Sequence, residues 1–365
     1  MSGSVRPVEE KDMAQITSLH ERLLGKREDY SSTSLRSSLQ TIVLENPWRN
    51  SSMPSLVYQQ GDGSLTGFLG VVPRPMLFNG RKVTAAISHS FVVEPGSRSS
   101  LAAIKLIKTY LAGPQDLSLA EGNNVTRKIW EGMGSSTSLL HSLSWTRPLQ
   151  PTQYVLSALQ RRGMTSVLAT PLQYLCRWID RSSIAQRGPF KLAAPRLAGE
   201  QLEVVNLCDD LTPNLCTGLK LLPDYAQDSM SWLLENMQKK TPGQQIRKVL
   251  LRNEKLEVVG WYLYSQTISG AYKVIQLVAN ENSLNDVLDH LFYQARKDGV
   301  VAISGYMAPQ FFQALAARDC LFRHDGATAW MLFHSRDQEI TDAFHQGRVF
   351  VSRLDGEWWI GFLLE

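Results

Sequence analysis

The first 150 residues show a changing pattern of hydrophobic and polar positions. Apolar residues three and four apart predict helices over 9–24 and 35–45, after a short extended stretch at 5–8. Apolar runs rich in β-branched and aromatic residues then predict strands at 55–60, 65–78 and 81–95. The last two runs are joined by Asn79-Gly80, a dipeptide typical of a tight hairpin turn. These three strands are therefore expected to form an antiparallel meander.

A helical pattern replaces the extended one after Pro95. The chain is predicted to continue with a helix at 99–113, a strand at 116–122, a helix at 124–134 and a strand at 138–149. A helix between two strands of one sheet favours a right-handed parallel crossover. A meander joined to such a crossover makes an α+β fold with a mixed β-sheet and flanking helices.

Residues 151–200 have a less regular pattern, and prolines interrupt them repeatedly. A helix is expected at 152–162 and a strand at 172–179. Because the second stretch contains Leu172 and Trp178, we expect a connector that packs against the neighbouring domains rather than a free linker.

The order of elements restarts near residue 201. The same reasoning predicts strands at 202–207, within 246–266 (two), at 271–280, 300–307 and 327–334, with helices at 227–239 and 283–299. Residues 92–94 and 120–122 align with 277–279 and 303–305 at a nearly constant offset. The chain therefore contains an internal structural repeat with little residue identity.

Length and composition fit two folded domains. The 365 residues are 43% hydrophobic and 20% charged, which excludes a largely disordered chain and a disulfide-based scaffold. The expected parts are an N-terminal domain at 1–150, a connector at 151–200 and a C-terminal domain at 201–365. The last part is expected to end in a hairpin that turns at Asp355-Gly356.

Charge and cysteine content narrow the function classes. A net charge of +4 without a basic run predicts no nucleic-acid partner, while a site for an anionic cofactor stays allowed. No CxxC pair or nearby histidine accompanies the cysteines, so we expect reduced thiols and no metal in a cytoplasmic protein. The sequence shows no signal peptide and no apolar run of about 20 residues, so no membrane partner is expected.

The most informative local motif joins a strand to the helix after it. Residues 91–111 end a strand in a hydrophobic pair and a proline, and a loop of small residues with Arg98 opens the helix. Asn123, Trp130 and Gly134 follow at a fixed spacing. These motifs and the doubled element order resemble the GNAT superfamily of acyl-CoA-dependent N-acyltransferases in its tandem form.

The resemblance implies two tandem GNAT-like domains, with a site for acetyl-CoA or another acyl-CoA in the first. Arg98 and Ala103 agree with the family's phosphate-binding loop, whereas Leu101 replaces a glycine and could turn its side chain into the core. A helix N-terminus binds phosphate through its unpaired N–H groups, and the amide of Val92 or Val93 would face the thioester oxygen. The implied cofactor-binding residues are Phe91, Val92, Val93, Arg98, Ser99, Ser100, Leu101, Ala102, Ala103 and Asn123.

Acyl transfer also needs a group that accepts the proton of the amine. His89 is one candidate, because an unperturbed imidazole titrates near neutral pH. Glu121 is a second candidate, Ser90 could relay a proton, and a base acting through ordered water stays open. The family's tyrosine, which would protonate the leaving thiolate, is replaced by Trp130, whose indole does not titrate usefully.

The second half departs further from the cofactor-binding pattern. Its equivalent loop, residues 280–284, has neither glycine nor arginine, and Glu281 would repel a pyrophosphate. We therefore expect this half to lack cofactor binding and to line the acceptor pocket. Candidate acceptor contacts are Asp224, Tyr225 and Trp232. Of the adjacent Trp358 and Trp359, one is expected in the core, and the other could stack on a sugar ring.

Three functions stay open. The first is an acyl-CoA-dependent N-acyltransferase that moves an acetyl group to a small amine, such as an amino sugar. The second is a non-catalytic GNAT-like protein that binds CoA or another ligand, which Leu101 and Trp130 favour. The third is a Fem-like aminoacyl transferase that uses charged tRNA, which the lack of a basic surface and of a helical arm disfavours. The sequence leaves the acceptor, the acyl length and the oligomeric state open.

Overall fold

The computed structural model divides the chain into two compact units. It describes residues 3–24, 32–96, 99–161, 166–181, 192, 194–210, 215–240, 245–266, 271–324, 330–357 and 359. Unit 1 consists of Met1–Ser142, Leu219–Lys240 and Gly326–Glu365, and unit 2 consists of Leu143–Gly218 and Thr241–Asp325. Each unit has its own β-sheet, so the protein is an α+β protein with two mixed sheets.

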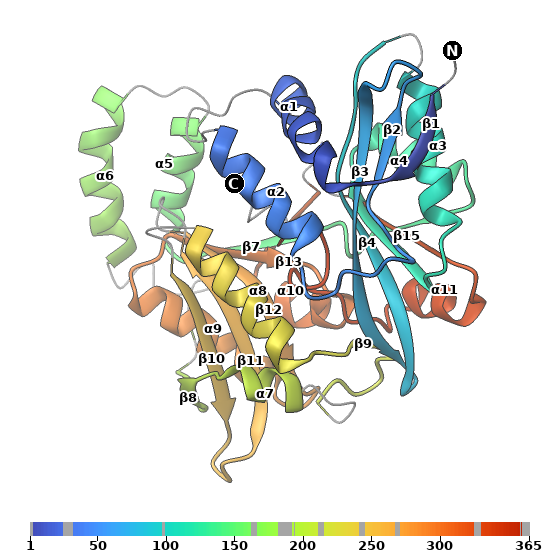
Figure 1. Ribbon diagram of the computed structural model, residues 1–365. Coiled ribbons are helices and arrows are strands. Elements are labelled where there is room, and N and C mark those ends of the chain that lie inside the picture. Colours follow the sequence, from blue (N-terminus) through green and yellow to red (C-terminus); the bar gives the residue numbers. More distant parts are fainter. Residues whose placement is uncertain are drawn as a thin grey trace. The chain divides into compact units, whose positions relative to one another are not determined.

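The strands and helices of unit 1 come from three separate stretches of chain (Figure 1). Its strands are β1 (Ser4–Pro7), β2 (Leu56–Gln59), β3 (Leu65–Phe78), β4 (Arg81–Val93), β5 (Leu117–Gly122), β6 (Ser136–Ser138), β9 (Leu221–Pro223) and β15 (Trp330–Ser335). Its helices are η1 (Glu10–Asp12), α1 (Met13–Leu24), α2 (Ser32–Leu44), α3 (Ser99–Leu111), α4 (Asn124–Glu131), α8 (Gln227–Lys240) and α11 (Gln338–His345).

The sheet of unit 1 has the strand order β1-β2-β3-β4-β5-β15-β6, and β9 pairs with β3. Strands β2, β3 and β4 pair antiparallel in sequence, which confirms the predicted meander. Strand β5 then pairs parallel with β4 after the crossover through α3, also as predicted. Asn79 and Gly80 both have positive φ (50° and 78°) at the turn between β3 and β4, which an Asn-Gly pair tolerates.

Alternate residues along each strand of this sheet point to opposite sides. Because both sides carry apolar residues, helices cover both faces. Helices α3 and α4 pack on the face that carries Tyr58, Leu69 and Ala86. On the opposite face, α1 and α2 cover Phe68 at one end, and α11 covers Ile87 at the other. The two faces therefore bury separate apolar cores.

The sheet of unit 2 has the strand order β14-β7-β13-β12-β11-β10-β8. Its strands are β7 (Ser144–Pro148), β8 (Ala198–Gln201), β10 (Ile246–Arg252), β11 (Val258–Gln266), β12 (Tyr272–Ala279), β13 (Ala302–Tyr306) and β14 (Leu321–Arg323). Its helices are α5 (Pro151–Arg161), α6 (Ser166–Arg181), α7 (Val204–Asp209), α9 (Leu284–Lys297), η3 (Pro309–Phe311) and α10 (Phe312–Ala316). An antiparallel meander, β10-β11-β12, again precedes a parallel pairing of β12 with β13.

Each sheet takes a strand from the opposite half of the sequence. Strand β15, near the C-terminus, lies between β5 and β6 in unit 1, and β7 lies between β13 and β14 in unit 2. The compact units therefore cross the sequence boundaries expected at residues 150 and 200. Where the two halves begin and end along the chain stays a prediction.

Two predicted strands are helices. Residues 172–179 lie within α6, because their apolar residues also fit helical spacing. The Asp180 carboxylate near the end of α6 accepts hydrogen bonds from the Thr152 and Gln153 N–H groups at the start of α5 (both 3.1 Å). Residues 204–207 begin α7, and the strand of this region, β8, ends before them. Both patterns were short apolar runs, for which periodicity alone does not separate strand from helix.

The predicted C-terminal hairpin is also wrong for the residues that the structure describes. Val349 makes a single parallel bridge to Leu221, and residues 353–357 form turns. The Asp355 carboxylate closes one turn by accepting hydrogen bonds from the Ser352 N–H (2.9 Å) and hydroxyl (2.6 Å). Asp355-Gly356 therefore belongs to a compact turn that brings its carboxylate inward.

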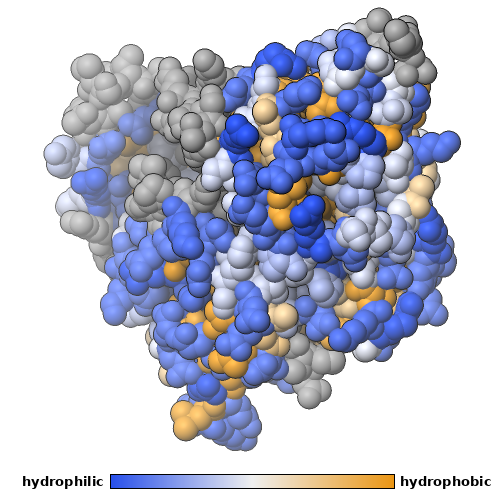
Figure 2. All heavy atoms as spheres, viewed as in Figure 1, coloured by the Kyte–Doolittle hydropathy of each residue, from blue (hydrophilic) through white to orange (hydrophobic). Residues whose placement is uncertain are grey.

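The visible face of the molecule is mostly hydrophilic, with hydrophobic residues in small separate groups (Figure 2). Within the described ranges, none of the helices combines the length and hydrophobicity that a bilayer crossing needs.

Candidate active site

Strands β4 and β5 of unit 1 separate before either of them ends. Their parallel pairing covers Ala85 to Ile87 on β4 and stops at the pair Ile87–Leu119, although β4 continues to Val93 and β5 to Gly122. Beyond this point the facing backbone groups of the two strands need other partners. We call the space between Ser88–Val93 and Ala120–Gly122 the fork.

A bulge in β4 turns one amide toward the fork. The register between β3 and β4 shifts near Gly70 and His89, and the next residue, Ser90, has a φ of 50°. A left-handed conformation is uncommon for serine and marks a local change in backbone direction. Val92 and Val93, which were expected to supply the amide at the thioester, lie opposite Phe68 and Gly67 in the sheet, and their role stays a prediction.

The side chain of Glu357 fills the fork and joins both strands. The Ser90 N–H donates to its Oε1 (2.9 Å), and the Glu121 N–H donates to its Oε2 (3.3 Å). Burial and the nearby Glu121 carboxylate raise the pKa of Glu357 to about 8, and the two N–H donors oppose that rise. A carboxyl group that titrates near neutral pH, at the point where two strands separate, is typical of a functional site.

The three predicted catalytic residues meet at the fork. Glu121 continues the face of β5 that carries Leu117 and Leu119, and its carboxylate lies close to the backbone of Gly356. Ser90 contributes its backbone amide, and its hydroxyl lies 3.1 Å from His89 Nδ1. The structure therefore brings together residues that are far apart in the sequence.

His89 is fully buried beneath the fork. Its ring packs against Gly70, where an added Cβ would lie 2.2 Å from ring atoms, and Nε2 has no hydrogen-bond partner among the described residues. Burial, and to a smaller extent the neighbouring His20, lowers the pKa of His89 to about 3. The imidazole is therefore neutral near pH 7 and is a weak proton acceptor.

His20 of α1 approaches the same bulge from the other side of His89. Its Nε2 lies 3.1 Å from the Ser90 carbonyl oxygen, and its Nδ1 lies 3.0 Å from the Ile16 carbonyl oxygen. Burial lowers the pKa of His20, and the two carbonyl acceptors oppose that shift. This contact places an imidazole nitrogen against the carbonyl group of the residue whose N–H enters the fork.

A buried ion pair holds the segment that carries Glu357. Arg74 of β3 and Asp355 are both almost fully buried, and Arg74 Nη2 lies 3.4 Å from Asp355 Oδ1. The Tyr225 hydroxyl donates to the same oxygen (2.7 Å). Burial raises the pKa of Asp355 and lowers the pKa of Arg74, while their mutual attraction opposes both shifts.

Three tryptophans pack around this ion pair. Arg74 stacks on Trp48 at 4.0 Å, and Trp48 makes edge-to-face contacts with Trp232 and Trp359. Trp359 is fully buried, as expected for one of the two adjacent tryptophans, and Trp358 lies outside the described residues. Of the predicted acceptor contacts, Tyr225 and Trp232 belong to this cluster, while the Asp224 N–H donates to the Pro75 carbonyl (3.0 Å).

The predicted phosphate-binding segment is described in part. Arg98 and the side chain of Ser99 lie outside the described residues, Ser100 is exposed, and Ala102 and Ala103 are buried against the sheet. Leu101 does not turn into the core: its side chain is 44% exposed. Phe91 is half-buried at the end of β4.

The second sequence motif has a structural role here. Asn123 caps α4, because its Oδ1 accepts hydrogen bonds from the N–H groups of Val125 (2.9 Å) and Thr126 (3.0 Å). Trp130 is buried against Tyr110, with ring centroids 5.7 Å apart. Tyr110 in turn donates its hydroxyl proton to the Ala86 carbonyl of β4 (2.6 Å).

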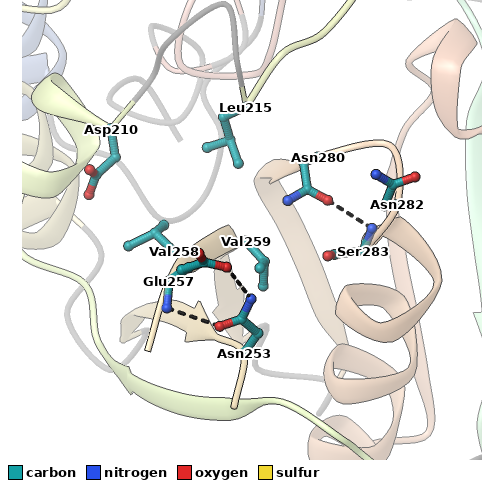
Figure 3. A pocket seen from close by; sticks show the side chains of 9 residues that line it. All are labelled: Asp210, Leu215, Asn253, Glu257, Val258, Val259, Asn280, Asn282 and Ser283. Carbon is teal, nitrogen blue, oxygen red and sulfur yellow. Dashed lines mark hydrogen bonds between the residues drawn. The ribbon is translucent and has the colours of Figure 1, made fainter. Parts of the chain in front are cut away.

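Unit 2 has a separate polar cavity of about 460 Å³ (Figure 3). It lies where the loop between β12 and α9 faces the turn between β10 and β11, so it includes part of the loop that the sequence placed in the cofactor position. Its lining residues are Asp210, Leu215, Asn253, Glu257, Val258, Val259, Asn280, Asn282 and Ser283. The carboxylates of Asp210 and Glu257 would repel a pyrophosphate. That this half does not bind the cofactor stays a prediction.

The cysteines and acidic groups give no sign of metal binding. All four cysteines are free thiols, and burial raises the pKa of Cys208 to about 11 and of Cys216 and Cys320 to about 12. Among the described residues, no group of three or more His, Cys, Asp or Glu side chains could hold a metal ion.

Comparisons with known proteins identify the fold. No protein-family model and no curated protein matches the sequence. A conserved protein of unknown function from Enterococcus faecalis V583, a probable N-acyltransferase, aligns with a TM-score of 0.58 at 9% identity, over 94% of this chain and 74% of that one. A GCN5-related N-acetyltransferase from Anabaena variabilis aligns with a TM-score of 0.56 at 12% identity, over 92% of this chain and 73% of that one.

The similarity extends to a third solved structure, which contains a bound ligand. Saccharomyces cerevisiae N-myristoyltransferase with bound myristoyl-CoA aligns with a TM-score of 0.50 at 11% identity, over 92% of this chain and 79% of that chain. Two mixed sheets, each with a meander and a parallel crossover, therefore make this chain an α+β protein with two tandem GNAT-like domains. At these identities the likeness establishes the fold, and function must be argued from the site.

Glu357, Asp355 and Arg74 were not found by sequence reasoning. Glu357 contacts Ser90 across 267 positions of the chain, and Arg74 contacts Asp355 across 281. No local motif marks either contact, because both depend on where the turn at 353–357 packs. The sequence did carry one signal, an arginine within the mostly apolar run 65–78, since arginine is rarely buried without a partner.

Proposed function

We propose that this protein transfers an acyl group from acyl-CoA to an amine at the fork of unit 1. The observation that carries the proposal is the Ser90 N–H, which a bulge with a φ of 50° turns between two separating parallel strands. A preorganised amide at such a place can bind the carbonyl oxygen of a thioester and stabilise the oxyanion that develops on it. The GNAT-like fold of the chain supports this assignment.

The remaining parts of an acyl-CoA site lie along β4 and α3. The unpaired edge of β4 beyond the fork could pair with the amides of a pantetheine arm. Helix α3, which begins at Ser99, would present its N-terminal N–H groups to the pyrophosphate, and Arg98 would add a positive charge. Acetyl-CoA is the acyl donor that we propose to test first.

Among the candidate bases, Glu357 has the strongest support. It lies at the fork, and a pKa raised to about 8 matches the pKa that suits a general base near neutral pH. His89 has a pKa lowered to about 3 and no direct access to the fork surface, because it is fully buried. Glu121 would then keep the pKa of Glu357 high rather than accept the proton itself.

We propose a small amine as the acceptor. An uncharged amine is needed for attack on the thioester, and a carboxylate at the fork can take the proton that this amine loses. Tyr225 and Trp232 would act on the acceptor through the segment that they hold, since both belong to the cluster around Asp355. A cytoplasmic location is part of the proposal, because four free thiols fit a reducing compartment.

Two observations favour a second function. Glu357 occupies the Ser90 N–H, and Trp130 stands in place of the family's tyrosine, so the fork could be permanently closed in a non-catalytic ligand-binding protein. The two functions differ in whether an acyl group is transferred.

Titration calorimetry with acetyl-CoA and CoA, followed by an amine screen for released thiol, tests the proposal. We expect one equivalent of acetyl-CoA to bind, and Arg98→Glu to weaken binding of both ligands by placing a carboxylate near the pyrophosphate. The matched control is Arg81→Glu on the exposed start of β4, which should leave both affinities unchanged. Binding without transfer to any amine would favour the non-catalytic function, and absence of binding would refute acyl-CoA as the ligand.

A further inference from the structure

The Glu357 carboxyl group lies where the proposed reaction needs an empty hydrogen-bond donor. We propose that Glu357 is an internal competitor of the acyl donor: its carboxyl group occupies the Ser90 N–H in the free protein, and the thioester carbonyl displaces it. The inference rests on the proposed function, since only an acyl-CoA brings a carbonyl oxygen to the fork. It adds that binding of the acyl donor itself frees Glu357 to act as the base.

The competition follows from the geometry of one N–H group. The Ser90 N–H points out of the β3–β4 ladder and donates to Glu357 Oε1 at 2.9 Å, which is a well-formed hydrogen bond. A thioester oxygen at the same N–H would need the same position within about 3 Å of the nitrogen. The two oxygens therefore cannot both occupy this position.

The contact to β5 is weaker and can survive the exchange. The Glu121 N–H lies 3.3 Å from Glu357 Oε2, at the long end of the range for a hydrogen bond. The Glu121 carboxylate lies next to Gly356 and disfavours a negative charge on Glu357. A displaced Glu357 therefore stays beside the fork without being held tightly in it.

The backbone around Glu357 is anchored, so its side chain can move alone. On one side, Asp355 accepts hydrogen bonds from Tyr225 and Ser352 and pairs with Arg74. On the other side, Trp359 is fully buried against Trp48. Glutamate has three side-chain torsions, so rotation can move its carboxyl group off the Ser90 N–H while the turn at 353–357 keeps its place.

The displaced carboxylate is then placed for proton transfer. As the amine nitrogen bonds to the thioester carbon and the carbon–sulfur bond breaks, the proton of the amine moves to Glu357 and from there to solvent. The sulfur leaves with the electron pair of the broken bond as CoA thiolate. Ser90 stabilises the oxygen of the intermediate through the N–H that Glu357 has left.

Calorimetric titration with acetyl-CoA and with CoA separates this competition from other effects, because CoA lacks the acyl carbonyl. We expect Glu357→Ala to bind acetyl-CoA about tenfold more tightly than the wild type, since the carboxyl group no longer competes for the Ser90 N–H. Affinity for CoA should change less than twofold. Turnover should fall in the same variant, because the base is lost.

Two further variants control the measurement. Glu357→Asp keeps the carboxylate but is too short to reach both strands, so it should also bind acetyl-CoA more tightly and keep part of the turnover. Glu339→Ala makes the same side-chain truncation at an exposed position of α11 and should alter neither affinity.

The ratio of acetyl-CoA to CoA affinity decides the outcome. An equal ratio in the wild type, Glu357→Ala and Glu357→Asp would refute the competition while leaving the proposed function intact. A complete lack of binding of both ligands to all variants would remove the proposed function as well.

Discussion

Removing Asp355 should destabilise unit 1 more than breaking an exposed ion pair would. Asp355 is 2% exposed and Arg74 is 3% exposed, so the substitution Asp355→Ala leaves a guanidinium buried beside Trp48 without its counter-ion. It also removes the acceptor of the Tyr225 hydroxyl and of Ser352. Breaking one side of a buried pair costs about 3–5 kcal/mol in the free energy of unfolding.

An exposed pair on the same sheet provides the comparison. Arg81 lies 2.8 Å from Asp337, but its side chain is 58% exposed. Arg81→Ala should therefore lower the free energy of unfolding by less than about 1 kcal/mol. The double variant Arg74→Met/Asp355→Leu should recover most of the loss, because no unpaired charge stays buried.

Urea denaturation followed by tryptophan fluorescence is a suitable assay, because Trp48, Trp232 and Trp359 surround the pair. The midpoint of the first transition and its m-value should be compared across the variants. A loss for Asp355→Ala no larger than that for Arg81→Ala would refute the reasoning. A double variant as unstable as Asp355→Ala would show that packing, and not the unpaired charge, causes the loss.

Three further outcomes test the site and the fold. The folded carboxyl of Glu357 has a pKa raised to about 8 and keeps its proton to about that pH, whereas the unfolded one releases it near the ordinary pKa of 4.5, so wild-type stability should fall as pH rises between these values. Across this pH range the loss in unfolding free energy is at most about 5 kcal/mol, and Glu357→Gln should remove it in urea denaturation; an unchanged pH dependence would contradict the raised pKa. Gly70→Ala should cost about 1–3 kcal/mol in the same assay, because the new Cβ would meet the His89 ring; a neutral effect would show that the ring moves freely. A fragment ending near residue 150 should aggregate in size-exclusion chromatography, because it lacks β15 between β5 and β6, and a monomeric, folded fragment would contradict this.

Local patterns predicted most strands and helices near the fork, and the reason lies in their length and turns. Strands β3 and β4 come from long apolar runs that Asn79-Gly80 joins. The length of these runs and the Asn-Gly turn between them predicted a hairpin without ambiguity. Short apolar runs were less informative, so residues 172–179 and 204–207 were predicted as strands and are helical. The predicted catalytic residues lay close to the fork because they belong to two neighbouring strands and follow the point where the pairing of these strands stops.

The sequence by itself determined the layered α+β fold, the internal repeat and the strands that carry His89, Ser90 and Glu121, because these depend on periodicity and turn residues within short stretches. Only the tertiary structure decided which amide and which carboxylate meet there. The direction of the Ser90 N–H depends on a bulge relative to β3. The position of Glu357 at the fork depends on a turn that is held by Arg74, which lies far from it in the sequence. Such contacts arise from packing between segments that are far apart in the chain, and a local sequence pattern does not predict them.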